Sequence, residues 1–135
     1  MYIFISSKKL DKLIYYREKN WKLFYKLFKD DDRFYIQHNH NRNKNASFAF
    51  TLIIKDPKKI NKQKIYKELN KNKIAYRLIT GGCFTAHPYR KYFNYNVYNN
   101  LNNALKAHKD GFFVGNAGQD LTRQIVSFYQ ILKNI

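Results

Sequence analysis

The residues best suited to chemistry lie together in the stretch 76–93, which reads YRLITGGCFTAHPYRKYF. It contains Cys83, and His87 follows four positions later. A cysteine and a histidine can form a nucleophilic pair in which the imidazole takes the thiol proton. A cysteine beside glycines can equally well fill space in a tight turn, because its side chain is small. The spacing alone leaves both interpretations open.

Gly81 and Gly82 stand at the end of a short apolar run in the same stretch. No Lys-Ser/Thr pair follows them, and the three-glycine dinucleotide fingerprint is absent, so a phosphate loop is excluded. Two glycines at the end of a strand indicate tightly turned backbone. The turn is either purely structural or pressed against a ligand or a partner.

Other candidate groups are sparse. His38 and His40 flank Asn39 in a polar segment, but no further metal ligand is near them in sequence, so we expect a solvated loop and no metal site. The glutamates are Glu18 and Glu68, both within expected helices, which leaves little material for paired-carboxylate hydrolysis. The sequence alone therefore indicates no complete catalytic set.

The composition bounds the class of protein. The chain has 135 residues, 44% of them hydrophobic and 18% aromatic, which is enough for one domain with a core. The net charge of +17 is typical of proteins that bind nucleic acids. However, the excess of Lys over Arg, with abundant Asn, Ile, Tyr and Phe, also follows from A/T-rich codons. We favour this second explanation, because phosphate readers more often use arginine.

The sequence gives two indirect indications of the cellular compartment. The chain has one cysteine, so no intrachain disulfide forms, which is typical of a reducing compartment. The apolar run before Lys8 is too short for a signal-peptide core or a membrane span. We therefore expect a cytoplasmic protein that does not bind a membrane.

Hydrophobic periodicity predicts a series of elements that could position these groups. Apolar residues recur on one helical face from Lys8 to Asp30, and Asn61, Asn100 and Asp120 are expected to cap three later helices. Gly111 is expected at the position after the third helix ends. The expected helices are 8–30, 61–72, 101–110 and one after 120, and the expected strands are 33–37, 47–55, 73–79 and 112–116; residues 94–100 stay ambiguous.

The order of these elements predicts an α/β (α+β) domain. It contains one mixed or antiparallel sheet, with helices packed mainly on one face and a long helix at its N-terminal end. Residues 1–135 are expected to form a single small domain, divided into the helix 8–30 and a sheet-and-helix part from 33 to 135.

Two long segments carry a resemblance. They are SFAFTLIIKD, from Ser47, and IAYRLITGGCFTAHPYRKYFNYNVYNNLNNALKAHKDGFFVGN, which ends at Asn116. Together with the helix 8–30, they resemble the C-terminal part of the DegT/DnrJ/EryC1/StrS family. These are enzymes that depend on pyridoxal phosphate and act on nucleotide-linked keto-sugars. The resemblance is nearest to the branch of GDP-4-keto-6-deoxymannose 3-dehydratases and runs from Lys8 to the C-terminus.

The resemblance implies a deoxysugar-forming aminotransferase or 3-dehydratase, as in lipopolysaccharide O-antigen synthesis, that works as a homodimer. In this family a large domain carries the lysine or histidine that works with pyridoxal or pyridoxamine phosphate, and this chain has neither motif. We therefore expect no catalytic, cofactor-binding or metal-binding residue here, and no activity from this chain alone. The substrate-binding residues implied by the resemblance are Arg77, Thr80, Gly82, Phe84, His87 and Asn116.

The chain departs from the family pattern at two places. Cys83 stands where colitose-type members have asparagine, and Ala117 stands where a histidine is usual. Two alternatives also remain. The chain is either the small subunit of a split enzyme, which docks onto a separately encoded large domain, or a basic nucleic-acid-binding module.

Overall fold

A computed structural model describes residues 2–38, 40, 45–79 and 81–135, with side chains described from Lys9 onward. Four helices, four strands and two short 3₁₀ turns follow one another along this part of the chain. In order they are α1 (Tyr2–Phe28), β1 (Phe34–Ile36), β2 (Ala49–Ile54), α2 (Lys62–Lys71), β3 (Tyr76–Leu78), η1 (Phe84–Ala86), η2 (Pro88–Tyr92), α3 (Asn102–Asp110), β4 (Gly111–Gly115) and α4 (Thr122–Lys133).

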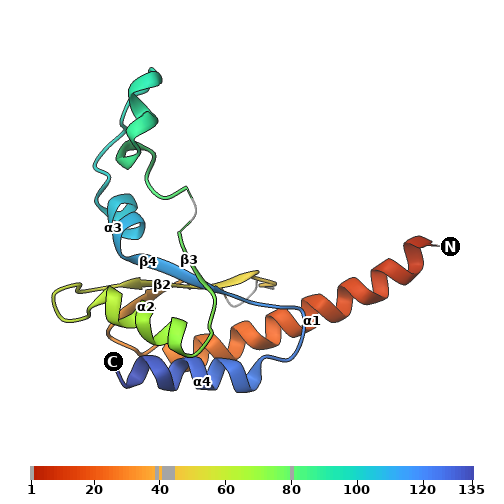
Figure 1. The fold of residues 1–135 in the computed structure, drawn as a ribbon. Coiled ribbons are helices and arrows are strands. Elements are labelled where there is room, and N and C mark those ends of the chain that lie inside the picture. Colours follow the sequence, from red (N-terminus) through yellow and green to blue (C-terminus); the bar gives the residue numbers. More distant parts are fainter. Residues whose placement is uncertain (1, 39, 41–44, 80) are drawn as a thin grey trace.

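The strands form one antiparallel sheet in the order β1-β2-β4-β3. Helices α1, α2 and α4 cover one face of it, while α3 and the segment before it rise on the other side (Figure 1). The predicted order of elements and the predicted fold class are confirmed. The division of the chain into a linking helix and a sheet-and-helix domain stays a prediction.

Alternation along the central strands explains why only one face is covered. In β2 the side chains of Phe50, Leu52 and Ile54 are buried, while the residues between them are only partly buried. Successive side chains of a strand point to opposite faces, so every second residue enters the core. Each large apolar side chain buried in this way contributes about 1.5–3 kcal/mol to folding.

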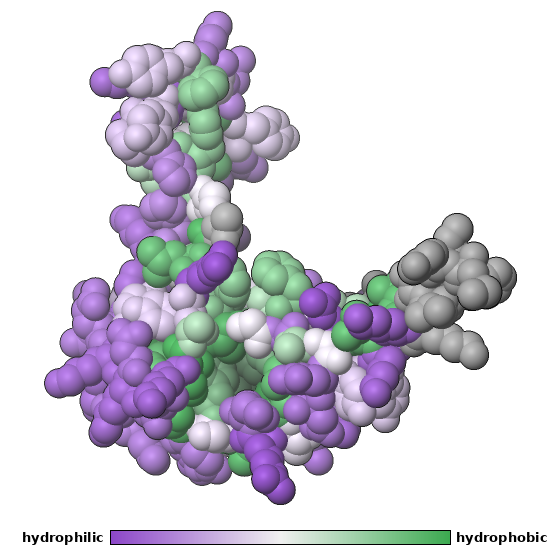
Figure 2. Space-filling model, turned by 45° about the vertical axis from the view of Figure 1, so that its right-hand side comes forward, coloured by the Kyte–Doolittle hydropathy of each residue, from purple (hydrophilic) through white to green (hydrophobic). Residues whose placement is uncertain are grey.

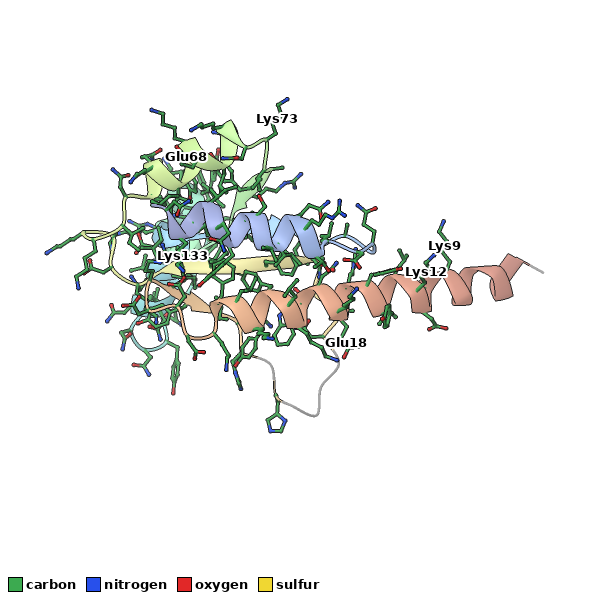
Figure 3. All side chains as sticks on the ribbon, turned by 90° about the horizontal axis from the view of Figure 1, so that it is seen from below. Lys9, Lys12, Glu18, Glu68, Lys73 and Lys133 are labelled. Atoms are coloured by element: carbon green, nitrogen blue, oxygen red, sulfur yellow. The ribbon has the colours of Figure 1, made fainter. Side chains whose placement is uncertain are left out.

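Aromatic rings fill most of the space between the sheet and α1. Phe24 stacks on Phe50 of β2 with ring centroids 4.7 Å apart, and Phe28 packs against Phe34 and Phe128. These contacts tie the helix to both the sheet and α4. Figure 3 shows α1 and α4 lying side by side beneath the sheet.

Helix α1 is longer than the predicted helix, because residues 2–7 contain no glycine or proline to end it. Its first half projects past the sheet, and Lys9 and Lys12 lie on this projecting part (Figures 1 and 3). Leu10 and Tyr15 are exposed there. In the part of the chain that the structure describes, no helix combines the length and apolar character that crossing a membrane requires.

The predicted caps are correct at one helix and displaced at two. The Asn61 side chain accepts from the amides of Gln63 and Lys64, as predicted. Asn100 and Asp120 each stand one residue before the cap position, and their side chains accept from the amides of Asn102 and Thr122. An oxygen on either residue therefore still satisfies one free helix amide.

Gly111 follows α3 directly, as predicted. Its φ is −94°, which is extended backbone rather than the left-handed region, and it begins β4. The position needs glycine for space, because an added Cβ would lie 2.3 Å from Cδ1 of Ile79 and 2.4 Å from the Ala107 carbonyl oxygen. Ala107 on α3 and Ile79, which follows β3, therefore leave room only for glycine at this position.

Candidate functional site

The face of the sheet opposite the helices carries Arg77. Its neighbour Tyr76 stacks on Tyr66 of α2, with ring centroids 4.4 Å apart, so Arg77 points to the other face. The strand register places Arg77 opposite Phe113, which in turn lies opposite Thr51. Among the described residues, the exposed Arg77 guanidinium has no hydrogen-bond or ion-pair partner, which leaves its donors available to an anion.

Residues 81–100, here called the arm, stand away from the sheet (Figure 1). The arm contains η1 and η2 and then an extended segment that leads into α3. Phe84 forms edge-to-face contacts with Phe93 and Tyr95, which gives the arm a small aromatic cluster of its own. Many other large side chains of the arm are exposed, including Tyr89, Tyr92, Val97 and Tyr98.

The base of the arm is a glycine turn fixed by two histidines. Gly81 and Gly82 have φ values of +77° and +51°, which L side chains rarely adopt. The amide of Cys83 donates to Nδ1 of His108, 3.3 Å away, and Nε2 of His87 lies 2.6 Å from the Gly81 carbonyl oxygen. The prediction of tightly turned backbone at the two glycines is therefore confirmed.

Cys83 and His87 do not form a nucleophilic pair in this arrangement. The Cys83 side chain is buried, and its Sγ lies 3.2 Å from Oγ1 of Thr85. His87 is engaged with Gly81 instead. Cys83 therefore fills space beside the glycines, which agrees with the second interpretation of its position.

The contact described for the loop histidine His38 is with a tyrosine. Nδ1 of His38 lies 2.9 Å from the hydroxyl of Tyr25, at an exposed position. The other part of the loop, residues 39 and 41–44, lies outside the described residues. Within the described residues, no group of three or more His, Cys, Asp or Glu side chains could hold a metal ion.

The predicted substrate-binding residues occupy three different places. Gly82, Phe84 and His87 lie in the first turns of the arm, and Arg77 lies on the strand that leads into it. Thr80 lies outside the described residues. Asn116 follows the other end of β4, beside the start of β2, because β3 and β4 run antiparallel.

Asn116 is 3% exposed, and its side chain is fully used within the protein. Its Nδ2 donates to the carbonyl oxygens of Arg17 and Ser47, and its Oδ1 accepts from Nδ2 of Asn20. This arrangement gives Asn116 a structural role. Its predicted contact with substrate stays a prediction, as do those of the other five residues.

A hollow of about 790 Å³ lies near Asn116, between the ends of β2 and β4 and helix α4. Phe50, Val114 and Phe128 contribute apolar walls, and the charged groups that line it are Lys73 and Arg123. Figure 2 shows apolar surface in a depression below the arm, bordered by hydrophilic residues.

Pyridoxal phosphate needs an anchoring lysine or a catalytic base, a phosphate cradle and a partner for the ring nitrogen. No lysine with described burial is buried, and the buried polar side chains in the described part are Asn20 and Asn116, which bind each other. The hollow is lined by no carboxylate that could meet a pyridine nitrogen. The described residues therefore do not fit the cofactor by themselves.

Sequence reasoning missed His108, which holds the base of the arm. The residue stands 25 positions after Cys83, within α3, and no short motif links the two. The sequence shows that His108 stands three residues before Gly111. It does not show that the Cys83 amide is its partner, because this contact depends on how the arm turns back. Asn20 was missed because its partner Asn116 is 96 positions away in the sequence.

A family model and two curated relatives all match this chain. The model of the DegT/DnrJ/EryC1/StrS aminotransferase family matches residues 5–124. The GDP-4-keto-6-deoxy-D-mannose 3-dehydratases of Escherichia coli O55:H7 and Yersinia pseudotuberculosis are 33% and 32% identical over 127 residues. Each match covers 93% of this chain, which spans 32% of the relative's length.

Solved structures of the same 3-dehydratase also match this chain. The E. coli dehydratase with bound hydrated pyridoxal phosphate superposes with a TM-score of 0.85 at 32% identity, over 96% of this chain and 33% of that chain. A mutant of GDP-4-keto-6-deoxymannose-3-dehydratase with bound GDP-perosamine gives 0.83 at 33% identity, over 93% and 32%. A Helicobacter pylori aminotransferase of pseudaminic acid biosynthesis, 16% identical with a TM-score of 0.69 over 89% and 32%, shares the fold alone.

Proposed function

The chain belongs to the DegT/DnrJ/EryC1/StrS aminotransferase family, and we propose that it forms the C-terminal small domain of an enzyme that dehydrates or transaminates a GDP-linked keto-sugar. The observation that carries the proposal is the match of 93% of the chain, at 33% identity, to a third of a GDP-sugar 3-dehydratase. The reaction then belongs to the synthesis of a deoxysugar.

In this enzyme the cofactor is held by the part that the chain does not match. When bound, pyridoxal or pyridoxamine phosphate supplies the ring that accepts electrons during the reaction. The residues described here do not fit it, so their role is to bind the sugar nucleotide and to close the site. The cofactor-bearing part is on the same polypeptide or on a separate one that docks with this chain, and the assembled enzyme is a homodimer.

Arg77 is the side chain best placed to bind the substrate. It lies on the open face of the sheet, and it has no partner among the described residues. A guanidinium can donate two parallel hydrogen bonds to the phosphate oxygens of a nucleoside diphosphate. The net charge of +17 attracts the same anion over a longer range.

The arm begins directly after this strand, so its first turns lie near Arg77 in sequence and at the same end of β4. Gly82 lets the His108 ring pack on the first turn of the arm, and Phe84 offers an exposed aromatic face for a sugar or base. Closing such a segment over the substrate excludes water and strengthens the charged contacts inside. The arm therefore forms a wall of the site opposite the cofactor.

The proposal is tested with a chimeric enzyme that carries this chain as its C-terminal part. The 127 matched residues of the E. coli 3-dehydratase are replaced by those of this chain, and consumption of GDP-4-keto-6-deoxy-D-mannose is followed with added pyridoxal phosphate. We expect measurable turnover. Arg77→Gln should lower kcat/KM by roughly 10- to 100-fold, because it removes a charge-assisted hydrogen bond to the substrate.

Lys67→Gln is the control, because Lys67 is an exposed cation on α2, which covers the other face of the sheet and does not line the hollow. It should leave kcat/KM unchanged. A folded chimera that binds the cofactor but does not consume the substrate would contradict the proposal. An Arg77→Gln chimera as active as its parent would remove Arg77 from the site.

A further inference from the structure

We propose that His108 is a positioning residue that fixes the base of the arm only while its ring is neutral, so that mildly acidic pH releases the arm. The effect of this release on substrate binding rests on the proposed function above. The release itself is a property of this chain and depends on two contacts of His108.

The first contact is a hydrogen bond across the turn. The backbone amide of Cys83 donates to Nδ1 of His108, which stands on α3, with 3.3 Å between the nitrogens. Cys83 itself is 4% exposed. Loss of the acceptor would leave a shielded amide without a partner, which is unfavourable in the folded state.

The second contact is close packing of the ring against Gly82. A Cβ at this position would lie 2.0 Å from Nδ1 of His108 and 3.0 Å from its Cγ. The ring therefore lies directly on the backbone of the turn, with no side chain between them. The hydrogen bond and the packing both join Nδ1 of His108 to the turn.

The hydrogen bond defines the protonation state of His108. An N–H donor requires a lone pair on its acceptor, so Nδ1 carries no proton and the ring proton is on Nε2. Protonation of the ring would put an N–H on Nδ1, facing the N–H of Cys83. Two donors cannot bind each other, so the turn must move away from α3.

His87 does not have this property, although it is close. Its ring packs edge to face against His108, with centroids 5.4 Å apart, and its Nε2 bonds to the Gly81 carbonyl oxygen. A carbonyl accepts a hydrogen bond from Nε2–H in both the neutral and the charged ring. Protonation of His87 therefore keeps its bond to Gly81, and it adds repulsion once His108 is also charged.

The carboxylate of α3 is paired elsewhere and does not pair with either histidine ring. On α3, Asp110 is paired with Lys106 at 3.2 Å, and Lys109 is exposed. From the arm, Arg90 donates to the Thr85 carbonyl oxygen, and from the start of α2, Lys62 donates to the Lys109 carbonyl oxygen. The buried Cys83 thiol is held by Thr85. Among the described residues, no carboxylate forms an ion pair with either histidine.

The backbone permits such a movement. Gly81 and Gly82 join the arm to the sheet, and both already occupy a conformation that requires glycine. The residues that move with the arm include Phe84 and His87, which are predicted to contact the substrate. If the proposed function is correct, acidification lowers substrate affinity through the position of the arm.

The test uses ¹H–¹⁵N spectra of the 135-residue chain without ligand, recorded from about pH 8 to 5, where imidazole titrates. In the wild type, the amide resonances of Gly82, Cys83 and Phe84 should shift together. Exchange of the Cys83 amide, corrected for its intrinsic rate, should become roughly five- to tenfold faster at the acidic end, as for a lost hydrogen bond.

Three variants distinguish protonation of His108 from loss of its acceptor and from protonation of His87. In His108→Asn, Oδ1 takes the place of Nδ1 and cannot be protonated, so the arm resonances should keep their high-pH positions throughout. In His108→Leu no acceptor remains, so the released pattern should appear at every pH. His87→Gln keeps a donor near Gly81, so its arm resonances should still move when the pH is lowered.

The proposal is overturned if the arm resonances of His108→Asn move with pH as in the wild type. It is equally overturned if the wild-type arm stays fixed while the His108 ring itself titrates. Unshifted methyl resonances of Ile65 and Leu69 in the core would show that each variant is folded. Because no nucleotide is present, these results do not depend on the proposed function, which the chimera tests separately.

Discussion

The side chains of Asn20 on α1 and Asn116 at the end of β4 bind each other inside the protein, with Nδ2 of Asn20 3.1 Å from Oδ1 of Asn116. Asn20 also donates to the Gln119 carbonyl oxygen and accepts from the amide of Leu121, just before α4. The pair therefore joins the long helix to the sheet and to the last helix. Buried amides with every group bonded in this way specify one arrangement of the elements.

Replacement of Asn116 by alanine should lower the free energy of unfolding by about 2–4 kcal/mol, because the carbonyl groups of Arg17 and Ser47 lose their donor inside the protein. Urea unfolding followed by circular dichroism measures the change. Asn70→Ala, at an exposed position of α2, is the control and should change stability by less than about 0.5 kcal/mol. Equal effects of the two variants would show that the buried pair is not structural.

Asp31 should make stability dependent on pH in the acidic range. Burial raises the pKa of its carboxyl group, but hydrogen bonds from the Arg33 guanidinium and backbone outweigh burial and hold this pKa below its ordinary value. A group with a lowered pKa in the folded state stabilises the protein above its unfolded pKa of about 4 and loses this contribution as pH falls.

Asp31→Asn should therefore lower the free energy of unfolding at pH 7 by about 1–3 kcal/mol and flatten its decline below about pH 4. The measurement is urea unfolding at a series of pH values. Asp30→Asn is the matched control, because the neighbouring Asp30 carboxylate is 85% exposed and pairs loosely with Lys29 at 3.5 Å. A decline with pH that is identical in Asp31→Asn and the wild type would refute the assignment.

Tyr66 should tolerate loss of its hydroxyl group. Its ring stacks on Tyr76, but the buried hydroxyl has no hydrogen-bond partner among the described residues. Burial, with smaller effects of Tyr76 and Asp110, raises the pKa of Tyr66 to about 12. Its neutral form therefore supports the fold below about pH 10, and this contribution is lost as pH rises toward 12.

Tyr66→Phe should leave the free energy of unfolding at pH 7 unchanged or raise it by up to about 1 kcal/mol, because an unsatisfied buried hydroxyl is removed. It should also reduce the loss of stability above about pH 10. Alkaline unfolding curves measure both effects. Tyr25→Phe, which removes a bond to His38, is the comparison and should not stabilise the protein.

The sequence predicted those parts of the fold that depend on local pattern. The apolar face of the first helix, the β-branched strand that became β2 and the Asn61 cap all follow from interactions within a few residues. Each of them can be read from a short window of sequence. They define the sheet and the helices that cover it.

The remaining features depend on residues that meet only in the folded chain. Asn20 and Asn116 are 96 positions apart, and His108 reaches Cys83 only because the arm turns back at two glycines. The segment 94–100 has no apolar period, so its extended path could not be predicted. The candidate site was therefore identified only by resemblance, and its internal contacts required the structure.

Gly82 and Gly81 should differ in what alanine does to them. Both have positive φ, so alanine strains the backbone at either position by about 1–2 kcal/mol. A methyl group on Gly81 would enter open space, since nothing lies within 4 Å of it, whereas at Gly82 the Cβ would lie 2.0 Å from His108. Only Gly82→Ala should displace the His108 ring and abolish the protection of the Cys83 amide from exchange. Similar spectra for the two variants would contradict the close packing of His108 on the turn.

Pyridoxal phosphate should label this chain without preference. The lysines whose burial is described are exposed or half-buried, and none has the surroundings that favour one Schiff base over the others. We therefore expect borohydride reduction and peptide mass spectrometry to find the label spread over many lysines, at levels that follow their exposure. As a comparison, the intact E. coli relative, whose structure holds hydrated pyridoxal phosphate, should retain the cofactor through gel filtration, and this chain should not. A single lysine that carries most of the label, together with a stable Schiff-base absorption band, would mean that the 135 residues form a cofactor site of their own.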